Sequence, residues 1–95
     1  MRTIYKYQPE FSGAFTIDTH KGARLLDAQY QYGALAFWFL VDTDKPLETR
    51  SFVVHGTGHD LGKVDEAFLL THVSSVQEMG GRLVWHIFEV LAAPR

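Results

Sequence analysis

The chain has 95 residues, 46% of them hydrophobic and 21% charged, which suits a single globular domain over residues 1–95 and leaves no room for two. The formal net charge of −2 argues against binding to a nucleic acid polymer, which needs a basic surface. The absence of cysteine excludes disulfides, zinc–thiolate sites and cysteine catalysis, and it favours a cytoplasmic protein.

The first strands are predicted from apolar residues that recur with a period of two. Arg2–Tyr7 is the first predicted strand and ends before Pro9. Phe15–Thr19 is the second, and a turn over residues 20–22 leads out of it.

A β-hairpin is predicted next. The strand Ala23–Tyr32 alternates, and its apolar face is formed by Leu26, Ala28, Tyr30 and Tyr32. Tyr32-Gly33-Ala34 forms the turn, and Leu35–Val41 returns. The return strand is apolar on both faces, with Phe37, Phe39 and Val41 on one side and Trp38 and Leu40 on the other. Both faces therefore need cover, either from the core of a sandwich or from another subunit.

The second half predicts three more strands, namely Thr49–His55, Phe68–Gln77 and Arg82–Leu91. Gly80-Gly81 forms the turn between the last two, and a helical turn capped by Asp60 is expected at Val64–Ala67. About seven short strands divided by glycine and proline turns predict an all-β fold, a small antiparallel β-sandwich or barrel.

No membrane association is predicted. The longest apolar run, Ala34–Val41, is far shorter than the ~20 residues of a spanning helix. The N-terminal residues have no apolar core of a signal peptide, which again favours the cytoplasm.

The segment HGTGHDLG, residues 55–62, is the strongest candidate for a ligand site. Gly56 and Gly58 permit positive φ angles, so successive amides could form a nest for an anion. Thr57 and His59 would add side-chain contacts. The same residues are also typical of a bulged turn that binds nothing, because a G-T-G motif outside a strand-to-helix context is a weak signal.

Two cations are candidates to assist this loop. Arg50 lies on the preceding strand, and Lys21 lies in a separate basic turn. Arg50 has a second possible role, because Glu89 sits inside an apolar strand, where a carboxylate needs a partner.

The histidines allow a catalytic alternative. His55-Gly56-Thr57 and His72-Val73-Ser74 are similar to the paired H-x-S/T motifs of two-histidine phosphoesterases, in which one imidazole acts as base and the other as acid. Those enzymes are larger two-lobed α/β proteins, whereas here the motifs lie 17 residues apart. We therefore assign no catalytic residue. We also expect no cofactor and no metal, since metal binding by imidazoles needs several convergent ligands.

The chain resembles a family of small proteins of phages and their bacterial hosts. The resemblance spans nearly the whole chain and rests on six motifs: K-G-A at 21–23, Q-Y-Q-x-G at 29–33, W-F-L-V-D at 38–42, E-T-R-S-F at 48–52, G-T-G-H at 56–59 and V-W-H-I-F-E at 84–89. It implies a small β-rich fold and carries no site residues.

Phage proteins of this size include oligomeric sponges, which hold the nucleotide signals of bacterial defence systems without cleaving them. By this analogy we expect a homo-oligomer that sequesters a small anionic nucleotide, of the cyclic ADP-ribose or cyclic dinucleotide type, in the host cytoplasm. The expected ligand residues are Lys21, Arg50, Gly56, Thr57, Gly58 and His59. The alternatives are a nucleotide phosphodiesterase that uses the histidines, and an accessory domain that contacts another protein through its apolar strands.

Overall fold

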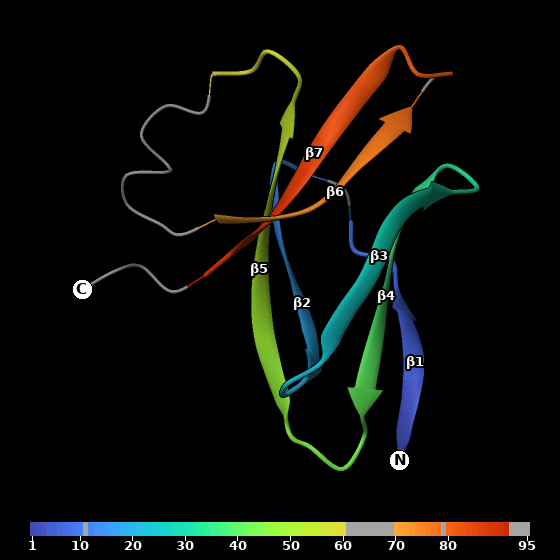
Figure 1. Ribbon diagram of the computed structural model, residues 1–95, viewed down its shortest axis with the longest axis vertical. Coiled ribbons are helices and arrows are strands. Elements are labelled where there is room, and N and C mark those ends of the chain that lie inside the picture. The colour runs from blue at the N-terminus through green and yellow to red at the C-terminus, as the bar shows by residue number, and fades with distance from the viewer. Residues whose placement is uncertain (11, 61–69, 79, 92–95) are drawn as a thin grey trace.

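The computed structural model describes residues 1–10, 12–60, 70–78 and 80–91, which hold seven strands (Figure 1). These are β1 (Arg2–Tyr7), β2 (Ala14–His20), β3 (Arg24–Gln31), β4 (Ala34–Asp42), β5 (Leu47–Gly56), β6 (Leu70–Glu78) and β7 (Leu83–Val90). Every predicted strand has a counterpart with ends close to those predicted. The helical turn predicted at Val64–Ala67 lies outside the described residues. Within the described ranges, no helix has the length and apolar character to cross a membrane.

The strands form two antiparallel sheets, one ordered β1-β4-β3 and the other β2-β5-β7-β6. The sheets pack as a small β-sandwich, so the all-β prediction is confirmed. β3 and β6 are in contact, and the Ser74 hydroxyl donates a 3.0 Å hydrogen bond to the carbonyl of Ala28.

Aromatic rings fill the space between the sheets. Phe37 and Phe39 of β4 and Phe52 of β5 are fully buried. Phe15 of β2 stacks on Phe52 and meets Phe37 edge-on, both at 5.6 Å between ring centroids. Such pairs add to the stabilisation that apolar burial supplies. Phe37, Phe39 and Val41, which were predicted to share one face of their strand, are all buried.

The predicted hairpin between β3 and β4 is confirmed. Tyr32 has φ +53° and Gly33 has φ +79°, as in the primed turns that match the twist of two-residue hairpins. Tyr32 stands at the tip and is 98% exposed, so its predicted place on the apolar face is wrong.

A β-bulge corrects the predicted facing of the start of β3. The pairing of β3 with β4 shifts between Leu25 and Asp27. Leu25 therefore packs against the core, and Leu26 is 45% exposed, although alternation placed Leu26 with the apolar set. Ala28 beyond the bulge is buried, as predicted.

Candidate functional site

The candidate site is built around the glycine turn, which we define as Gly56, Thr57, Gly58 and His59. It begins at the last residue of β5. The His59 amide donates to the Gly56 carbonyl at 3.1 Å and closes the turn, and Gly58 has φ +85°, which favours glycine. The Thr57 amide donates to the carbonyl of Val84 at 3.2 Å, so the turn is fixed to β7.

The imidazole of His59 folds back over Gly56. Its Nδ1 accepts a 3.0 Å hydrogen bond from the Gly56 amide. The proton of the neutral ring therefore sits on Nε2, which can donate to a ligand. A Cβ at position 56 would lie 2.8 Å from Cε1 of this ring. Gly56 is thus needed for the close approach of His59, whereas the sequence predicted a positive φ that Gly56 does not have.

The predicted nest of free amides is wrong. The amides of Gly56, Thr57 and His59 all donate within the protein. A nest requires successive N–H groups that point at one anion. An anionic ligand at this turn would therefore be held mainly by side chains.

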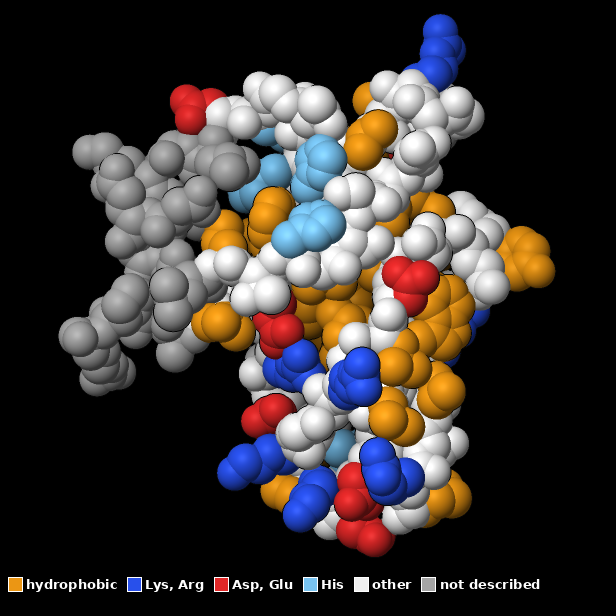
Figure 2. All heavy atoms as spheres, in the orientation of Figure 1, with side chains coloured by type: hydrophobic (Ala, Val, Ile, Leu, Met, Phe, Trp, Pro, Cys, Tyr) orange, Lys and Arg blue, Asp and Glu red, His pale blue; other side chains and the backbone are white. Residues whose placement is uncertain are grey.

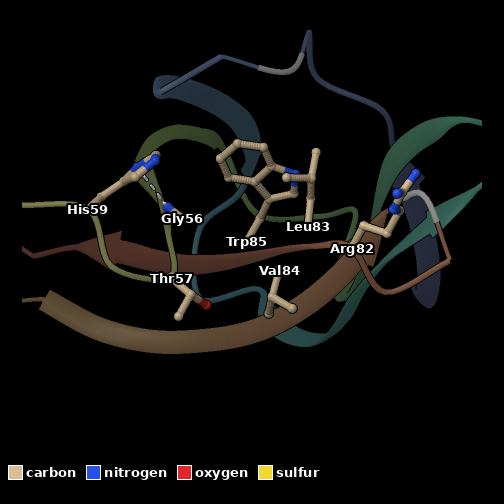
Figure 3. Close-up of a pocket in the computed structure, with 7 residues that line it drawn as sticks. All are labelled: Gly56, Thr57, His59, Arg82, Leu83, Val84 and Trp85. Atoms are coloured by element: carbon tan, nitrogen blue, oxygen red, sulfur yellow. Dashed lines mark hydrogen bonds between the residues drawn. The ribbon is translucent and has the colours of Figure 1, made fainter.

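One side of the turn opens into a hollow of about 320 Å³, which we call the Trp85 hollow. Figure 3 shows the residues that line it: Gly56, Thr57, His59, Arg82, Leu83, Val84 and Trp85. Antiparallel pairing of β5 with β7 sets Trp85 directly opposite Gly56. His59 and Trp85 project to the same side, with ring centroids 6.0 Å apart (Figure 3).

Arg82 supplies the charge of the Trp85 hollow. It immediately precedes β7, it is exposed, and it forms no ion pair within the described part of the chain. The indole of Trp85 is half-buried and donates a 3.1 Å hydrogen bond to Glu78. The hollow therefore combines a fixed aromatic wall with a cation that can serve a ligand.

A second hollow, of about 230 Å³, lies against the same turn. We call it the Phe88 hollow, and it is lined by His55, Gly56, Thr57, Gly58, His59, His86 and Phe88. Among the described residues, Nε2 of His55 is buried without a hydrogen-bond partner. Such an unmatched group costs roughly 1–3 kcal/mol, which a ligand bonded to this nitrogen would offset.

Four polar side chains form a hydrogen-bonded chain beside the Phe88 hollow. Nε2 of His72 lies 3.0 Å from the Ser75 hydroxyl, which lies 2.8 Å from Nδ1 of His86. Nε2 of His86 lies 2.8 Å from the hydroxyl of Thr57. Because a hydroxyl has one proton, Ser75 donates to one imidazole and accepts from the other. The pale-blue histidines gather in the upper part of Figure 2.

The predicted motif His72-Val73-Ser74 does not act as a unit. A bulge between His72 and Ser74 shifts the pairing of β6 with β7. His72 and Ser75 consequently share one face, while the Ser74 hydroxyl turns to the Ala28 carbonyl of β3. This geometry contradicts the assembly of paired H-x-S/T motifs that the phosphoesterase alternative requires.

The structure does not bring Arg50 to the glycine turn. Its guanidinium forms two hydrogen bonds with the Glu89 carboxylate, at 2.6 and 2.7 Å, and a third with the carbonyl of Ala23. The bond to Glu89 raises the pKa of Arg50, so the cation stays charged. Of the two roles predicted for Arg50, the pairing with Glu89 is confirmed.

Lys21 lies even farther from the turn in the fold. It follows β2 directly, and its amide donates to the carbonyl of Pro46 at 2.7 Å. In Figure 1 this end of the molecule, with the β2–β3 and β4–β5 connections, lies opposite the end of β5 that carries the glycine turn. Of the six predicted ligand residues, the structure therefore gathers only the four of the turn.

The comparisons with known proteins give one family. The model of a domain of unknown function, DUF7352, matches residues 1–94. The chain belongs to this family. No curated protein and no solved structure matched it. Within the described part of this DUF7352 domain, no group of three histidine or acidic side chains is placed to hold a metal ion.

Sequence reasoning missed the main partners of the turn, namely Ser75, Arg82, Trp85 and His86. They come from β6, from β7 and, for Arg82, from the position just before β7, and their place depends on the pairing of β5 with β7. One signal was present in the sequence, because Arg82 follows the Gly80-Gly81 turn and precedes a strand with Trp85 and His86 on opposite faces. The sequence alone did not indicate which strand pairs with that strand.

Proposed function

We propose that this DUF7352 domain binds a small anionic ligand of the nucleotide class at the glycine turn. The observation that carries the proposal is that the Trp85 and Phe88 hollows meet at the same three residues, Gly56, Thr57 and His59. The Trp85 hollow alone, at about 320 Å³, falls at the lower end of the usual size of small-molecule sites, roughly 300–1,000 Å³.

The chemistry of the lining suits a phosphate-bearing aromatic ligand. The indole of Trp85 gives a nucleobase a partly exposed aromatic surface, with His59 beside it. Arg82 matches a phosphate in charge and geometry, and Nε2–H of His59 adds a donor, while the Thr57 hydroxyl is hydrogen-bonded to His86. The unmatched Nε2 of His55 offers one more contact on the far side of the turn.

The resemblance to phage proteins extends this proposal to sequestration. In that role the domain holds a nucleotide immune signal, of the cyclic ADP-ribose or cyclic dinucleotide type, and releases it unchanged.

A second candidate function is hydrolysis of the bound nucleotide, which the chain of His72, Ser75, His86 and Thr57 favours. A serine hydroxyl between two imidazoles can lose its proton to one of them as its oxygen attacks the phosphorus, while the ester oxygen leaves with a proton from the other imidazole. Water then hydrolyses the phosphoserine and restores the serine. The two functions differ in the fate of the ligand.

A thermal-shift titration tests the proposal. Wild-type protein is heated with cyclic ADP-ribose, with cyclic di-GMP and with adenosine, which has the base and sugar without phosphate. A ligand at about 100 times its Kd adds roughly 2.7 kcal/mol to the stability of the folded state, and a charged nucleotide should give this shift where adenosine gives less. A melting temperature unchanged by every charged nucleotide contradicts the proposal.

The fate of the ligand separates the two candidates. The stabilising nucleotide is incubated with the protein, the protein is denatured, and the nucleotide is analysed by chromatography. Intact ligand supports sequestration. Product that disappears with Ser75→Ala makes hydrolysis the function instead.

A further inference from the structure

The end of the molecule opposite the glycine turn carries a basic hollow of about 280 Å³. Its lining residues are Arg2, Lys21, Gly22, Arg24, Leu40, Val41, Asp42 and Lys45. The blue side chains at the lower end of Figure 2 show the cations at this end, with red acidic groups among them. Four of the eight lining residues are cationic, in a chain whose net charge is −2.

Strand pairing places the two arginines around the basic hollow. β4 is the central strand of its sheet, and Arg2 of β1 pairs with Asp42 at its end. Arg24 of β3 pairs with Leu40 from the other side. Residues 40 and 42 of β4 point to the same face, so the two arginines reach that face from opposite neighbours.

The β2–β3 and β4–β5 connections are hydrogen-bonded to each other, which places Lys21 and Lys45 at the same end of the molecule. The amide of Lys21, after β2, donates to the Pro46 carbonyl at 2.7 Å. Nδ1 of His20 donates to the Lys45 carbonyl at 2.7 Å. The backbone of each lysine is therefore hydrogen-bonded to the other connection. This lowers the entropic cost of bringing the two charges together.

The cations of the basic hollow have no direct ion pair among the described residues, although Lys45 is close enough to Asp42 to contribute, after the Asp44 amide, to the lowered pKa of that carboxyl. These cations are Arg2, Lys21, Arg24 and Lys45. The single carboxylate of the lining, Asp42, already accepts the amide of Asp44 at 3.0 Å and lies 3.6 Å from the amino group of Met1. Glu48 lies nearby, 3.4 Å from the Gly22 amide.

We infer that the basic hollow is a second anion site, which takes a multiply charged phosphate compound of the size of inorganic triphosphate. Guanidinium groups bind phosphate oxygens through two parallel hydrogen bonds, and lysines add point charges. The charges converge on one bounded hollow and form no track along the surface, which favours a compact ligand over a nucleic acid polymer. This site is distinct from the glycine turn, and its existence does not depend on the function proposed there.

Titration calorimetry with inorganic triphosphate at physiological salt tests this inference. We expect heat of binding and an affinity that falls about tenfold or more in Arg24→Gln, because the lost contact is a charged hydrogen bond. Lys6→Gln, on the exposed part of β1, removes the same charge as Arg24→Gln and should leave the affinity unchanged.

Three results would overturn the inference. The first is the absence of binding heat with folded wild-type protein. The second is an equal loss in Lys6→Gln, which would assign the binding to diffuse charge. The third is tighter binding of a short double-stranded DNA than of triphosphate. Urea unfolding of each variant confirms that it is folded. Because triphosphate has no nucleoside, its failure to bind the basic hollow would leave the proposal of nucleotide binding at Arg82 and His59 intact. In the same way, a failure of nucleotide binding would leave the inference about the basic hollow intact.

Discussion

Gly56 shows how one residue of the turn depends on another. Its φ is not positive, and its lack of a side chain serves the imidazole of His59, which occupies the space that a Cβ would need. The same contact holds the His59 ring through its Nδ1, which leaves Nε2 as the ring nitrogen that can donate to a ligand. The geometry of the proposed binding group thus rests on the glycine.

Replacement of Gly56 by alanine is expected to displace His59. The hydrogen bond from the Gly56 amide would be lost, which costs about 0.5–1.5 kcal/mol of stability, measured by urea unfolding. Nucleotide affinity should fall as far as in His59→Ala. Gly13→Ala is the matched control, because a Cβ there meets nothing within 4 Å. Equal effects of Gly56→Ala and Gly13→Ala on stability and on nucleotide affinity would contradict this role of Gly56.

Tyr30 gives a prediction for alkaline pH. Burial first, and then the Glu78 carboxylate, raises the pKa of the Tyr30 phenol. The folded state therefore prefers the neutral phenol, and this stabilisation is complete below the ordinary pKa of about 10 and lost as pH rises through the raised value. Urea midpoints should fall less from neutral pH to about pH 11 in Tyr30→Phe than in wild type.

The control for Tyr30 is Tyr32→Phe, because Tyr32 is 98% exposed at the hairpin tip. Its urea midpoints should follow those of wild type over the same pH range. If wild type and Tyr30→Phe lose stability in parallel, the neutral Tyr30 is not the source of the alkaline loss.

At the scale of strands, period-two alternation, short apolar runs and turn residues together were enough to predict the seven described strands, and Gly33 was enough to predict the hairpin turn. Alternation failed where a bulge intervened, since one extra residue reverses the facing of its neighbours. The bulge in β3 turned Leu26 outward, and the bulge in β6 separated Ser74 from His72. Neither bulge has a glycine or proline at the site to announce it in the sequence.

The ion pair of Arg50 and Glu89 joins β5 to β7 inside the fold. The side chains are only 17% and 15% exposed, and the guanidinium also lies 5.1 Å from the ring centroid of Phe39. Glu89→Ala leaves a buried cation without its partner and should cost about 3–5 kcal/mol in urea unfolding. The double variant Arg50→Met/Glu89→Leu should recover most of this loss.

Asp44→Ala provides the exposed comparison for this ion pair. The Asp44 carboxylate is 84% exposed and pairs only with the amino group of Met1, so its removal should change stability little. If Glu89→Ala lost as little stability as Asp44→Ala, the ion pair of Arg50 and Glu89 would not be a structural link between β5 and β7.

At the scale of the whole molecule, the sequence could not predict which strands are neighbours. The order β2-β5-β7-β6 sets Trp85 opposite Gly56 and leaves Lys21 at the other end. Pairing of this kind depends on contacts between distant parts of the chain, which no local pattern encodes. The glycine turn was therefore found as a motif, while its partner Arg82 was not.

The homo-oligomer is still a prediction, and we expect its interface on the outer face of the three-stranded sheet. Ile4 is 56% exposed and pairs across the strands with Leu40, next to Trp38, and both of these are half-buried. We expect light scattering at micromolar concentration to give at least twice the chain mass of 10.8 kDa. Ile4→Lys should lower this mass and Leu47→Lys, on the other sheet, should not. A monomer at this concentration would contradict the prediction.

The central claim is that side chains of the glycine turn and of β7 hold a nucleotide. The most direct measurement is titration calorimetry of wild type, His59→Ala and Arg82→Gln with the nucleotide that stabilises wild type most. The account predicts that each variant folds and binds about 1–3 kcal/mol more weakly, because each loses a hydrogen-bonding partner of the ligand. An affinity unchanged in both variants would contradict it and would leave residues 56–59 as a structural turn.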